Sequence, residues 1–575
     1  MSESRLSTRP KHLQHVLRLG KGLQRAESPS PIAESDGGNA DGLHRRLNNR
    51  QVQLLSIGGT VGTGLFIGIG AGLAKGGPGS LLVCTALYAM VLGLTNNSIA
   101  EMNTYMPVSG GFIRLAGHWV DDALGFMVGW NFFFYEALLI PFEIVALNLV
   151  VSFWSDTVTD AGPTAGFIIA VIIAYGVLNL LAVGVFGEAE FWLALGKVLL
   201  IFILFMFTFV TMVGGNPQGD AYGFRYWSNV HDAFATFRTE GDLGRLEGFM
   251  GALASAAFFV VGPDYISMVA AESKHPSRYV KTAFKTVYFR FGLFFIGAAL
   301  TCGIVLSHTD ETLVEVHLGT GSGHGTAAAS PWVIAMSNLG IEGLPHLVNA
   351  LLFTTIFSAG NTYTYCATRS LYSLALDGRA PAFLRKTTKN GIPIYCFAVT
   401  MVFPLLAFLQ LDSSSAEALT ILLALITGGG IVDYITMNIT FLFYYRACKA
   451  QGVDRKKMPY FGYFQPYCAW IALILHTVVC YTYGYTSLAP FDAKNFFSNY
   501  TMQIIAPFMY LGWKLIKRTK VVSAKECDLV WERPVIDAYE ERAMIVDPPT
   551  GFWEEIIGLV GIKKNKKKNA AEVHV

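Results

Sequence analysis

Long apolar segments alternate with short polar segments over most of this chain. A helix that crosses a bilayer needs roughly 20 consecutive apolar residues, and twelve segments between residues 52 and 516 meet that length. Lipid accepts only backbone whose polar groups are satisfied internally, as they are in a helix. The pattern therefore predicts an all-α integral membrane protein with twelve transmembrane helices. Their approximate limits are 52–74, 80–100, 124–152, 164–184, 189–213, 247–271, 283–306, 345–375, 392–411, 417–445, 465–487 and 497–516.

The two ends of the chain are polar and lie outside this pattern. Residues 1–46 are rich in Ser, Arg and Gly and contain no apolar core of a signal peptide, so we expect a disordered tail. Residues 517–575 form a second tail, after a twelve-helix domain at residues 47–516. Within the second tail, the segment GFWEEIIGLVGI at residues 551–562 precedes KKNKKKN. This pattern fits either a docked helix or an anchor at the membrane surface.

Basic residues gather in alternate loops. Lys and Arg precede the first segment and follow the sixth, eighth, tenth and twelfth, whereas residues 291–368 contain neither. Short loops that are rich in Lys and Arg stay in the cytoplasm. This charge bias, together with an even number of spans, predicts that both termini are cytosolic.

Composition narrows the class of protein further. Hydrophobic residues make up 53% of the chain and charged residues only 15%, compared with about 25% charged in a soluble protein. The formal net charge of +2 argues against nucleic acid as a partner. The eight cysteines are scattered and form no metal or redox motif. The sequence offers no P-loop, nucleophile–base pair or metal-ligand spacing, so we expect no enzyme, no metal and no cofactor.

The segment at residues 56–72, SIGGTVGTGLFIGIGAG, is apolar, uncharged and interrupted by glycines. A helix interruption inside a bilayer leaves backbone groups without partners, and it persists where those groups line a cavity. Unwound backbone at mid-membrane is the substrate site of many secondary transporters. The sequence therefore predicts a broken first helix and a secondary active transporter.

A second interruption is predicted in the sixth segment, because Gly262 and Pro263 should break the helix FMGALASAAFFVVGPDYISMVAAE in its middle. The two interruptions lie five segments apart, as in transporters that are built from inverted repeats. This spacing predicts a five-plus-five inverted repeat with broken helices 1 and 6, followed by two additional helices. The charge of Asp264 comes directly after the second interruption.

The chemistry of the two interruptions suggests their ligand. A half-helix that starts near Thr63 presents free N–H groups and a positive dipole end, which suit a carboxylate. Free carbonyls near Thr60 and around Val261 suit an ammonium group, and a ligand with both groups close together is an α-amino acid. Two adjacent phenylalanines would form an aromatic wall over the site, or they pack in the core. The predicted substrate-binding residues are Thr60, Gly62, Thr63, Gly64, Leu65, Glu143, Phe258, Phe259, Val261, Gly262 and Asp264.

Five ionisable residues inside the predicted spans are functional candidates, because charges are costly there. Lys197 either exchanges protons or tethers helices, and Glu143 either carries a proton or contacts the substrate. Asp264 either gates and senses protons or caps the second half-helix. Lys197, Glu143 and Asp264 are the predicted proton-coupling residues. Glu136 fits helix packing, and Asp433 fits a carboxylate that faces the interior of the bundle.

The chain resembles the fungal amino-acid permeases of the amino acid–polyamine–organocation superfamily in several ordered motifs. These are SIGGTVGTGLFIG, GGPGSLL, NTYMPVSGGFIRLAGHWVDDALGFMVGWNFF, IPFEI, YISMVAAE and SAGNTYTYCATRSLYSLALDGRAPAFL. The resemblance extends from about residue 47 to residue 552. It departs from the family pattern at Pro263-Asp264 and at Asp433, which changes the charge and shape expected near the substrate.

The resemblance implies a LeuT-like inverted-repeat fold, import of amino acids across the plasma membrane by alternating access, and symport with protons. In proton-coupled members of the superfamily, the ammonium group of Lys197 would take the place of a sodium ion and link span one to span eight, near Ser358 and Asn361. The resemblance also implies cytosolic tails that ubiquitin-ligase adaptors bind. The expected partners are therefore an amino acid, protons, the lipid bilayer and these adaptors.

Two other functions fit the sequence. Glu143, Asp264 and Asp433 would attract ammonium groups, which favours a permease of the same fold for polyamines or carnitine. A sensor that binds amino acids and scarcely transports them would be favoured by longer tails than these. The sequence does not separate symport from exchange, and it does not specify the amino acid.

Overall fold

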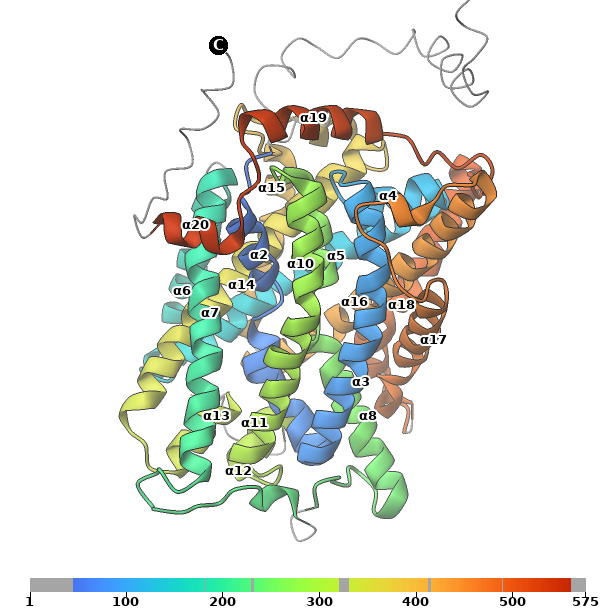
Figure 1. Cartoon of the computed structure of the whole chain (residues 1–575). Coiled ribbons are helices and arrows are strands. Elements are labelled where there is room, and N and C mark those ends of the chain that lie inside the picture. The colour runs from blue at the N-terminus through green and yellow to red at the C-terminus, as the bar shows by residue number, and fades with distance from the viewer. Residues whose placement is uncertain are drawn as a thin grey trace, which may run out of the picture.

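Every regular element in the described part of the chain is a helix. The computed structural model describes residues 45–180, 183–228, 232–319, 330–411, 415–488 and 490–559. Within these ranges two isolated backbone bridges occur and no strand. Figure 1 shows the long helices packed side by side in one bundle. The prediction of an all-α protein is confirmed, and residues 1–44 of the predicted N-terminal tail lie outside the described residues.

The helices follow one another along the chain, and the connection between α7 and α8, residues 213–240, is long. The first half contains α2 (Asn49–Gly58), η2 (Gly64–Gly68), α3 (Ile69–Tyr105), α4 (Phe112–Trp119), α5 (Asp122–Val151), α6 (Ala161–Leu180) and α7 (Val183–Met212). The middle contains α8 (Gly241–Phe259), α9 (Pro263–Val269), α10 (Pro276–Arg290), η6 (Phe291–Ile296), α11 (Gly297–Val305), α12 (Glu311–Leu318) and α13 (Pro331–Asn338). The last part contains α14 (Gly343–Leu376), α15 (Ile394–Thr400), η8 (Phe403–Leu411), α16 (Ser415–Gln451), α17 (Tyr467–Thr482), α18 (Ala493–Lys517), α19 (Arg533–Val546) and α20 (Phe552–Leu559).

Ten helical stretches of the described chain are long and apolar enough to cross a membrane. One of them, Gly64–Tyr105, joins the first two predicted spans. Gly77 interrupts this stretch with φ 73° and ψ 174°, and Pro78 follows, at the predicted boundary between those spans. Helix α18, at the twelfth predicted span, is not among the ten. The chain is therefore a multi-pass helical membrane protein, and the count of twelve spans stays a prediction.

Basic loops and the C-terminal helices gather at one end of the bundle. Figure 1 shows α4, α15 and α19 at this end, and α12 and α13 at the opposite end. Asp377, just after α14, accepts hydrogen bonds from Arg114 Nε at 2.9 Å and from Arg379 Nη1 at 2.8 Å. Burial raises the pKa of Asp377, but His118, Arg114 and Arg379 outweigh burial and lower that pKa to about 2. The carboxylate therefore stays charged near neutral pH and joins α4 to the end of α14.

The C-terminal tail is docked at this same end. Glu555 of α20 accepts hydrogen bonds from the backbone N–H groups of Asn49 at 3.2 Å and Arg50 at 2.9 Å, in the first turn of α2. A carboxylate at a helix N-terminus satisfies free donors and complements the helix dipole. Glu540 of α19 accepts a hydrogen bond of 2.8 Å from the backbone of Ser277, at the start of α10. Residues 552–559 form a docked helix, whereas the basic run KKNKKKN lies outside the described residues and the anchor at the membrane surface stays a prediction.

Candidate functional site

The first helix interruption separates α2 from η2. Helix α2 ends at Gly58, and the N–H groups of Thr60 and Val61 fold back on the carbonyl of Ile57 at 3.1 and 3.0 Å. The next two carbonyls receive side chains from other helices: Lys197 Nζ of α7 donates to that of Gly58, and Tyr363 Oη of α14 donates to that of Gly59 at 3.0 Å. The carbonyls of Gly58 and Gly59 are therefore hydrogen-bonded to side chains of this chain, whereas no hydrogen bond among the described residues reaches the carbonyl of Thr60.

Two glycines of this interruption allow other helices to approach closely. A Cβ atom at Gly62 would lie 2.9 Å from Ala359 Cβ and 3.3 Å from Glu143 Oε1. A Cβ atom at Gly59 would overlap the ring of Tyr265. Since side chains would force these helices apart, glycine is required at both positions.

Glu143 lies at the N-terminal end of the helix that resumes after the interruption. Its Oε2 accepts a hydrogen bond from the hydroxyl of Thr63, and the carboxylate also interacts with the backbone N–H of Thr63. The side chain of Glu143 is buried. A helix N-terminus attracts anions because its N–H groups are free and its dipole end is positive. The sequence assigned this place to a substrate carboxylate, and the structure shows Glu143 at its edge.

Lys197 is buried at the opposite side of the interruption, at the C-terminal end of α2, where a cation complements the helix dipole. Its electrostatic partners are the carboxylates of Glu190 and Glu143. Glu190, two turns before Lys197 in α7, accepts hydrogen bonds from Ser358 Oγ at 2.7 Å and from Asn361 Nδ2 at 2.6 Å. The link to span eight that the resemblance implied for Lys197 thus runs through Glu190.

Glu190 is the residue that the sequence analysis missed. It lies at the second position of the predicted fifth span, seven residues before Lys197 and therefore on the same helix face. Because Glu190 lies at the start of the span, its charge could equally belong to the loop before the span. The spacing from Lys197 was the signal that could have identified it.

The second interruption separates α8 from α9. Helix α8 ends at Phe259, Val260 is extended, and α9 begins at Pro263. Asp264 Oδ1 accepts a hydrogen bond of 3.2 Å from the backbone N–H of Gly262, so Asp264 caps the helix in which it lies. Among the described residues, no hydrogen bond reaches the carbonyl oxygens of Val260 or Val261. Both interruptions therefore have open carbonyls, because no hydrogen bond among the described residues reaches those of Thr60 and Val61 at the first.

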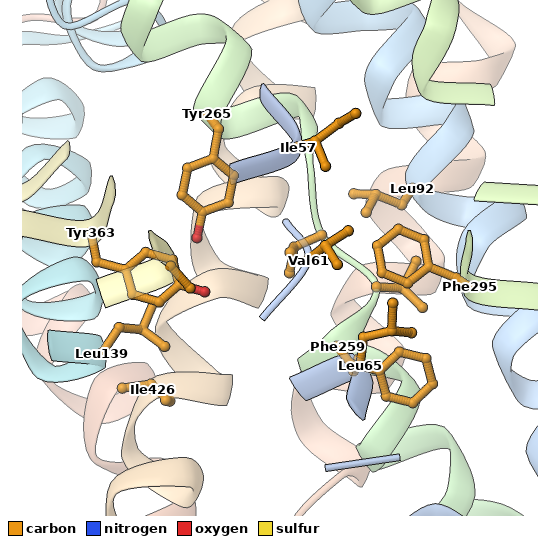
Figure 2. Close-up of a cluster of buried hydrophobic side chains, with 14 of the residues drawn as sticks. Ile57, Val61, Leu65, Leu92, Leu139, Phe259, Tyr265, Phe295, Tyr363 and Ile426 are labelled. Carbon is orange, nitrogen blue, oxygen red and sulfur yellow. The ribbon is translucent and has the colours of Figure 1, made fainter. Parts of the chain in front are cut away.

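Apolar side chains cover one side of the first interruption. Figure 2 shows Leu65 near Phe259 and Phe295, with Val61 between this group and the tyrosines Tyr265 and Tyr363. The rings of Phe259 and Phe295 are stacked at 6.4 Å between centroids. Phe258, which Figure 2 does not label, lies close to Gly64 and packs edge-on against Phe142 at 5.5 Å. These contacts place both phenylalanines of the sequence prediction beside the first interruption.

Three buried carboxylates lie on the other side of the second interruption. Glu136 of α5, Asp264 of α9 and Asp433 of α16 interact electrostatically with one another, and all are buried. Asp433 Oδ1 accepts a hydrogen bond of 2.9 Å from Asn131, whereas its Oδ2 and both oxygens of Glu136 have no hydrogen-bond partner among the described residues. The hydroxyl of Tyr265 is buried and interacts with the carboxylate of Glu136. This group, the acidic cluster, resembles a site for a cation, because isolated buried carboxylates are costly.

The predicted site residues thus gather around two neighbouring interruptions. A Cβ atom at Gly262 would lie 3.5 Å from Cγ2 of Thr60, so the two breaks are adjacent. Glu143 and Lys197 belong to the first break, and Asp264 belongs to the second. Glu136 and Asp433, which the sequence left outside the substrate site, join Asp264 in the acidic cluster. Among the described residues, no group of His, Cys, Asp and Glu could hold a metal ion.

Comparisons with known proteins identify the class of molecule to which this arrangement is similar. Residues 51–526 match the family described as amino acid permease. The chain is 41% identical to the general amino acid permease AGP2 of Saccharomyces cerevisiae, over 83% of this chain and 80% of that protein. It is 33% identical to the dicarboxylic amino acid permease of the same yeast (88% and 82% covered). It is 34% identical to the proline-specific permease of Emericella nidulans (88% and 91% covered). The names of these relatives refer to different amino acids.

Proposed function

The chain belongs to the amino acid permease family of fungi, and on this premise we propose that it imports an amino acid across the plasma membrane by symport with protons. Membership of the family establishes amino acid transport by a multi-pass membrane protein. The single observation that supports the finer proposal is the charge arrangement at the first interruption. There Lys197 lies at the end of α2, and Glu143 lies at the start of the next helix.

The proposed topology places both termini in the cytosol. Helix α2 with η2 forms the broken first span, α8 with α9 forms the broken sixth, and α17 with α18 follows two five-helix repeats. The basic loops and docked tail at one end of the bundle support this orientation, because such loops stay in the cytoplasm. The tails would also carry the contacts with ubiquitin-ligase adaptors.

The proposed substrate site divides an amino acid between the two interruptions. The substrate carboxylate binds the N–H groups of Thr63, Gly64 and Leu65, at the positive end of the resumed helix. The substrate ammonium binds the open carbonyls of Val260 and Val261, where the acidic cluster adds negative potential. Both charges of a zwitterion are then satisfied without a free ion in the membrane.

In this proposal, proton coupling arises because Glu143 and the substrate carboxylate compete for the same helix N-terminus, at Thr63. Glu143 as a carboxylate already satisfies the hydroxyl and N–H of Thr63. A substrate carboxylate would add a second negative charge to this position, which is costly in a buried site. Protonation of Glu143 removes that conflict, so substrate and proton bind together. One charge that crosses 100 mV supplies about 2.3 kcal/mol to the cycle.

Lys197 and Asp264 have different parts in this proposal. Lys197 holds the end of α2 against α7, through Gly58 and the network of Glu190, and its loss of a proton would release this connection during alternating access. Asp264 keeps α9 capped and contributes charge to the substrate ammonium.

The test is uptake of radiolabelled amino acids in cells that lack their own permeases, at acidic and neutral pH, with and without a protonophore. The proposal predicts amino acid uptake that rises at acidic pH and falls with the protonophore. The Glu143→Gln variant should transport amino acids down their gradient and lose the response to pH. Uptake that changes neither with pH nor with the protonophore would contradict proton symport. Amino acid exchange would then be the remaining mechanism.

A second candidate function is a permease of the same fold for polyamines or carnitine. The acidic cluster favours it, because Glu136, Asp264 and Asp433 interact with no basic side chain among the described residues. Including spermidine and carnitine in the uptake panel separates the two functions. Uptake of spermidine or carnitine without any amino acid, lost in Asp433→Asn, would replace the first proposal with the second.

A further inference from the structure

A lateral groove runs along the outside of the bundle and is lined by residues outside both interruptions. Its volume is about 890 Å³, within the range of sites that hold a drug-sized ligand. Helix α3 and helix α10 with η6 form its walls, and the loop between α16 and α17, from Met458 to Phe464, closes one end. Neither the substrate site nor the acidic cluster contributes to its lining.

The groove is polar at one end and apolar along its length. Lys281, Lys285 and Asn97 line the end near the basic loops, whereas Met90 and Ile296 line the opposite end. A helix rises 1.5 Å per residue, so Lys281 and Ile296 lie about 22 Å apart along the axis of α10 and η6. This length matches one leaflet of a bilayer with its headgroup region, which is roughly 20–22 Å thick.

The charged end of the groove has no counter-ion among the residues that the structure describes. Neither Lys281 nor Lys285 forms an ion pair or hydrogen bond with any residue in the described ranges, although Lys281 is half-buried. The loop that closes this end is held in place, because Tyr460 Oη and the carbonyl of Tyr463 both bond to Asn97, at 3.2 and 2.9 Å. The two lysines therefore line a preformed end of the groove.

The apolar part of the groove is open where a side chain is missing. A Cβ atom at Gly292 would meet no atom within 4 Å, so this glycine leaves room against the wall. The aromatic rings of Tyr463 and Phe464 are 70% and 81% exposed beside the charged end. Aromatic residues of this kind concentrate at the level of lipid headgroups.

We propose that this groove binds one anionic phospholipid of the cytosolic leaflet, with its headgroup phosphate at Lys281 and Lys285 and an acyl chain along Met90, Gly292 and Ile296. The orientation rests on the proposed function, in which the basic loops are cytosolic. An anionic lipid should bind more tightly than a neutral one, because its negative headgroup would interact with two lysines that have no counter-ion among the described residues. The length and the apolar wall select a lipid over a free phosphate ion.

The test is native mass spectrometry of the purified full-length protein, delipidated and then titrated with phosphatidylserine or with phosphatidylcholine of the same acyl chains. The proposal predicts one bound phosphatidylserine with clear preference over phosphatidylcholine. Changing Lys281→Gln and Lys285→Gln together should weaken phosphatidylserine binding by about fivefold per lysine. The matched control is Lys386→Gln with Lys389→Gln, two exposed lysines of the α14–α15 loop outside the groove, which should bind as the wild type does.

A second pair of variants tests the apolar part. Gly292→Leu fills the groove and should reduce binding of both lipids, whereas Gly166→Leu, on an exposed face of α6 with equally open space, should not. Inorganic phosphate should not displace the bound lipid. The proposal is overturned if the lysine pair changes nothing, if phosphatidylcholine or a sterol binds equally well, or if phosphate competes. Lipid occupancy is measured without any transported substrate. A negative result therefore contradicts the lipid site and does not contradict the proposal that the protein transports amino acids.

Discussion

The two helix interruptions of this protein differ in sequence and in charge. At the first, the carbonyls of Gly58 and Gly59 are bonded to Lys197 and Tyr363, and a carboxylate lies at the next helix start. At the second, the carbonyls stay open and Asp264 caps its own helix beside two further acids. The first interruption offers the N–H groups of a helix start, and the second offers carboxylates that interact with no basic side chain among the described residues. A zwitterion complements both, which is why we place its carboxylate at the first and its ammonium at the second.

The largest expected effect comes from filling the first interruption. Gly62→Val should reduce uptake roughly hundredfold or more, because displacement of a site by about 1 Å has effects of that size and a Cβ atom here would press on Ala359 and Glu143. Gly166→Val, in open space on α6, is the matched control. Uptake is measured alongside surface protein. Normal uptake by Gly62→Val would remove the first interruption from the substrate site.

Removal of the buried Lys197 should have the next largest effect. Lys197→Met leaves Glu190 and Glu143 without their cation, and a buried partner left alone costs roughly 3–5 kcal/mol. The melting temperature of the purified protein should fall, and the second change Glu190→Gln should recover part of the loss. If the double variant is no more stable than Lys197→Met alone, Glu190 and Lys197 do not act as a pair.

Two substitutions of Asp264 separate the effect of its hydrogen bond from the effect of its charge at the second interruption. Asp264→Asn keeps an oxygen that can accept from Gly262 and removes the negative charge, whereas Asp264→Ala removes both. Loss of the cap costs about 1 kcal/mol of stability. We expect Asp264→Asn to fold like the wild type and to bind the amino acid more weakly, with a higher KM. Equal KM values for Asp264→Asn and the wild type would place the substrate ammonium elsewhere.

The smallest expected effect concerns the docked tail, which holds only the first broken helix. Glu555→Gln removes the charge at the start of α2, and the interaction of a charge with a helix dipole is worth roughly 0.3–1 kcal/mol. Hydrogen exchange in the first turn of α2 should become faster, whereas exchange in α8 and α9 should not change. Unchanged exchange at Asn49 and Arg50 would show that α20 does not hold α2.

The contrast between the interruptions could be predicted only in part from the sequence. Gly-rich and Gly-Pro segments predicted where the helices end, since the cause is local backbone chemistry. Glu143, Lys197 and Asp264 were identified because charges in apolar segments are conspicuous. The partners were not predictable, because Tyr363 and Glu190 reach the first interruption from distant helices, through tertiary packing. The capping of α2 by Glu555 depends in the same way on where the tail docks.

The most direct test of the central claim is the number of protons taken up when the amino acid binds. Purified protein in nanodiscs is titrated calorimetrically with its best substrate, in buffers of different ionisation enthalpy and at a pH high enough that Glu143 is ionised before the substrate binds. The shared use of one helix end by Glu143 and the substrate predicts uptake of about one proton per bound amino acid in the wild type, and none in Glu143→Gln, which should still bind. The same proton uptake in both proteins, or none in the wild type, would contradict the account.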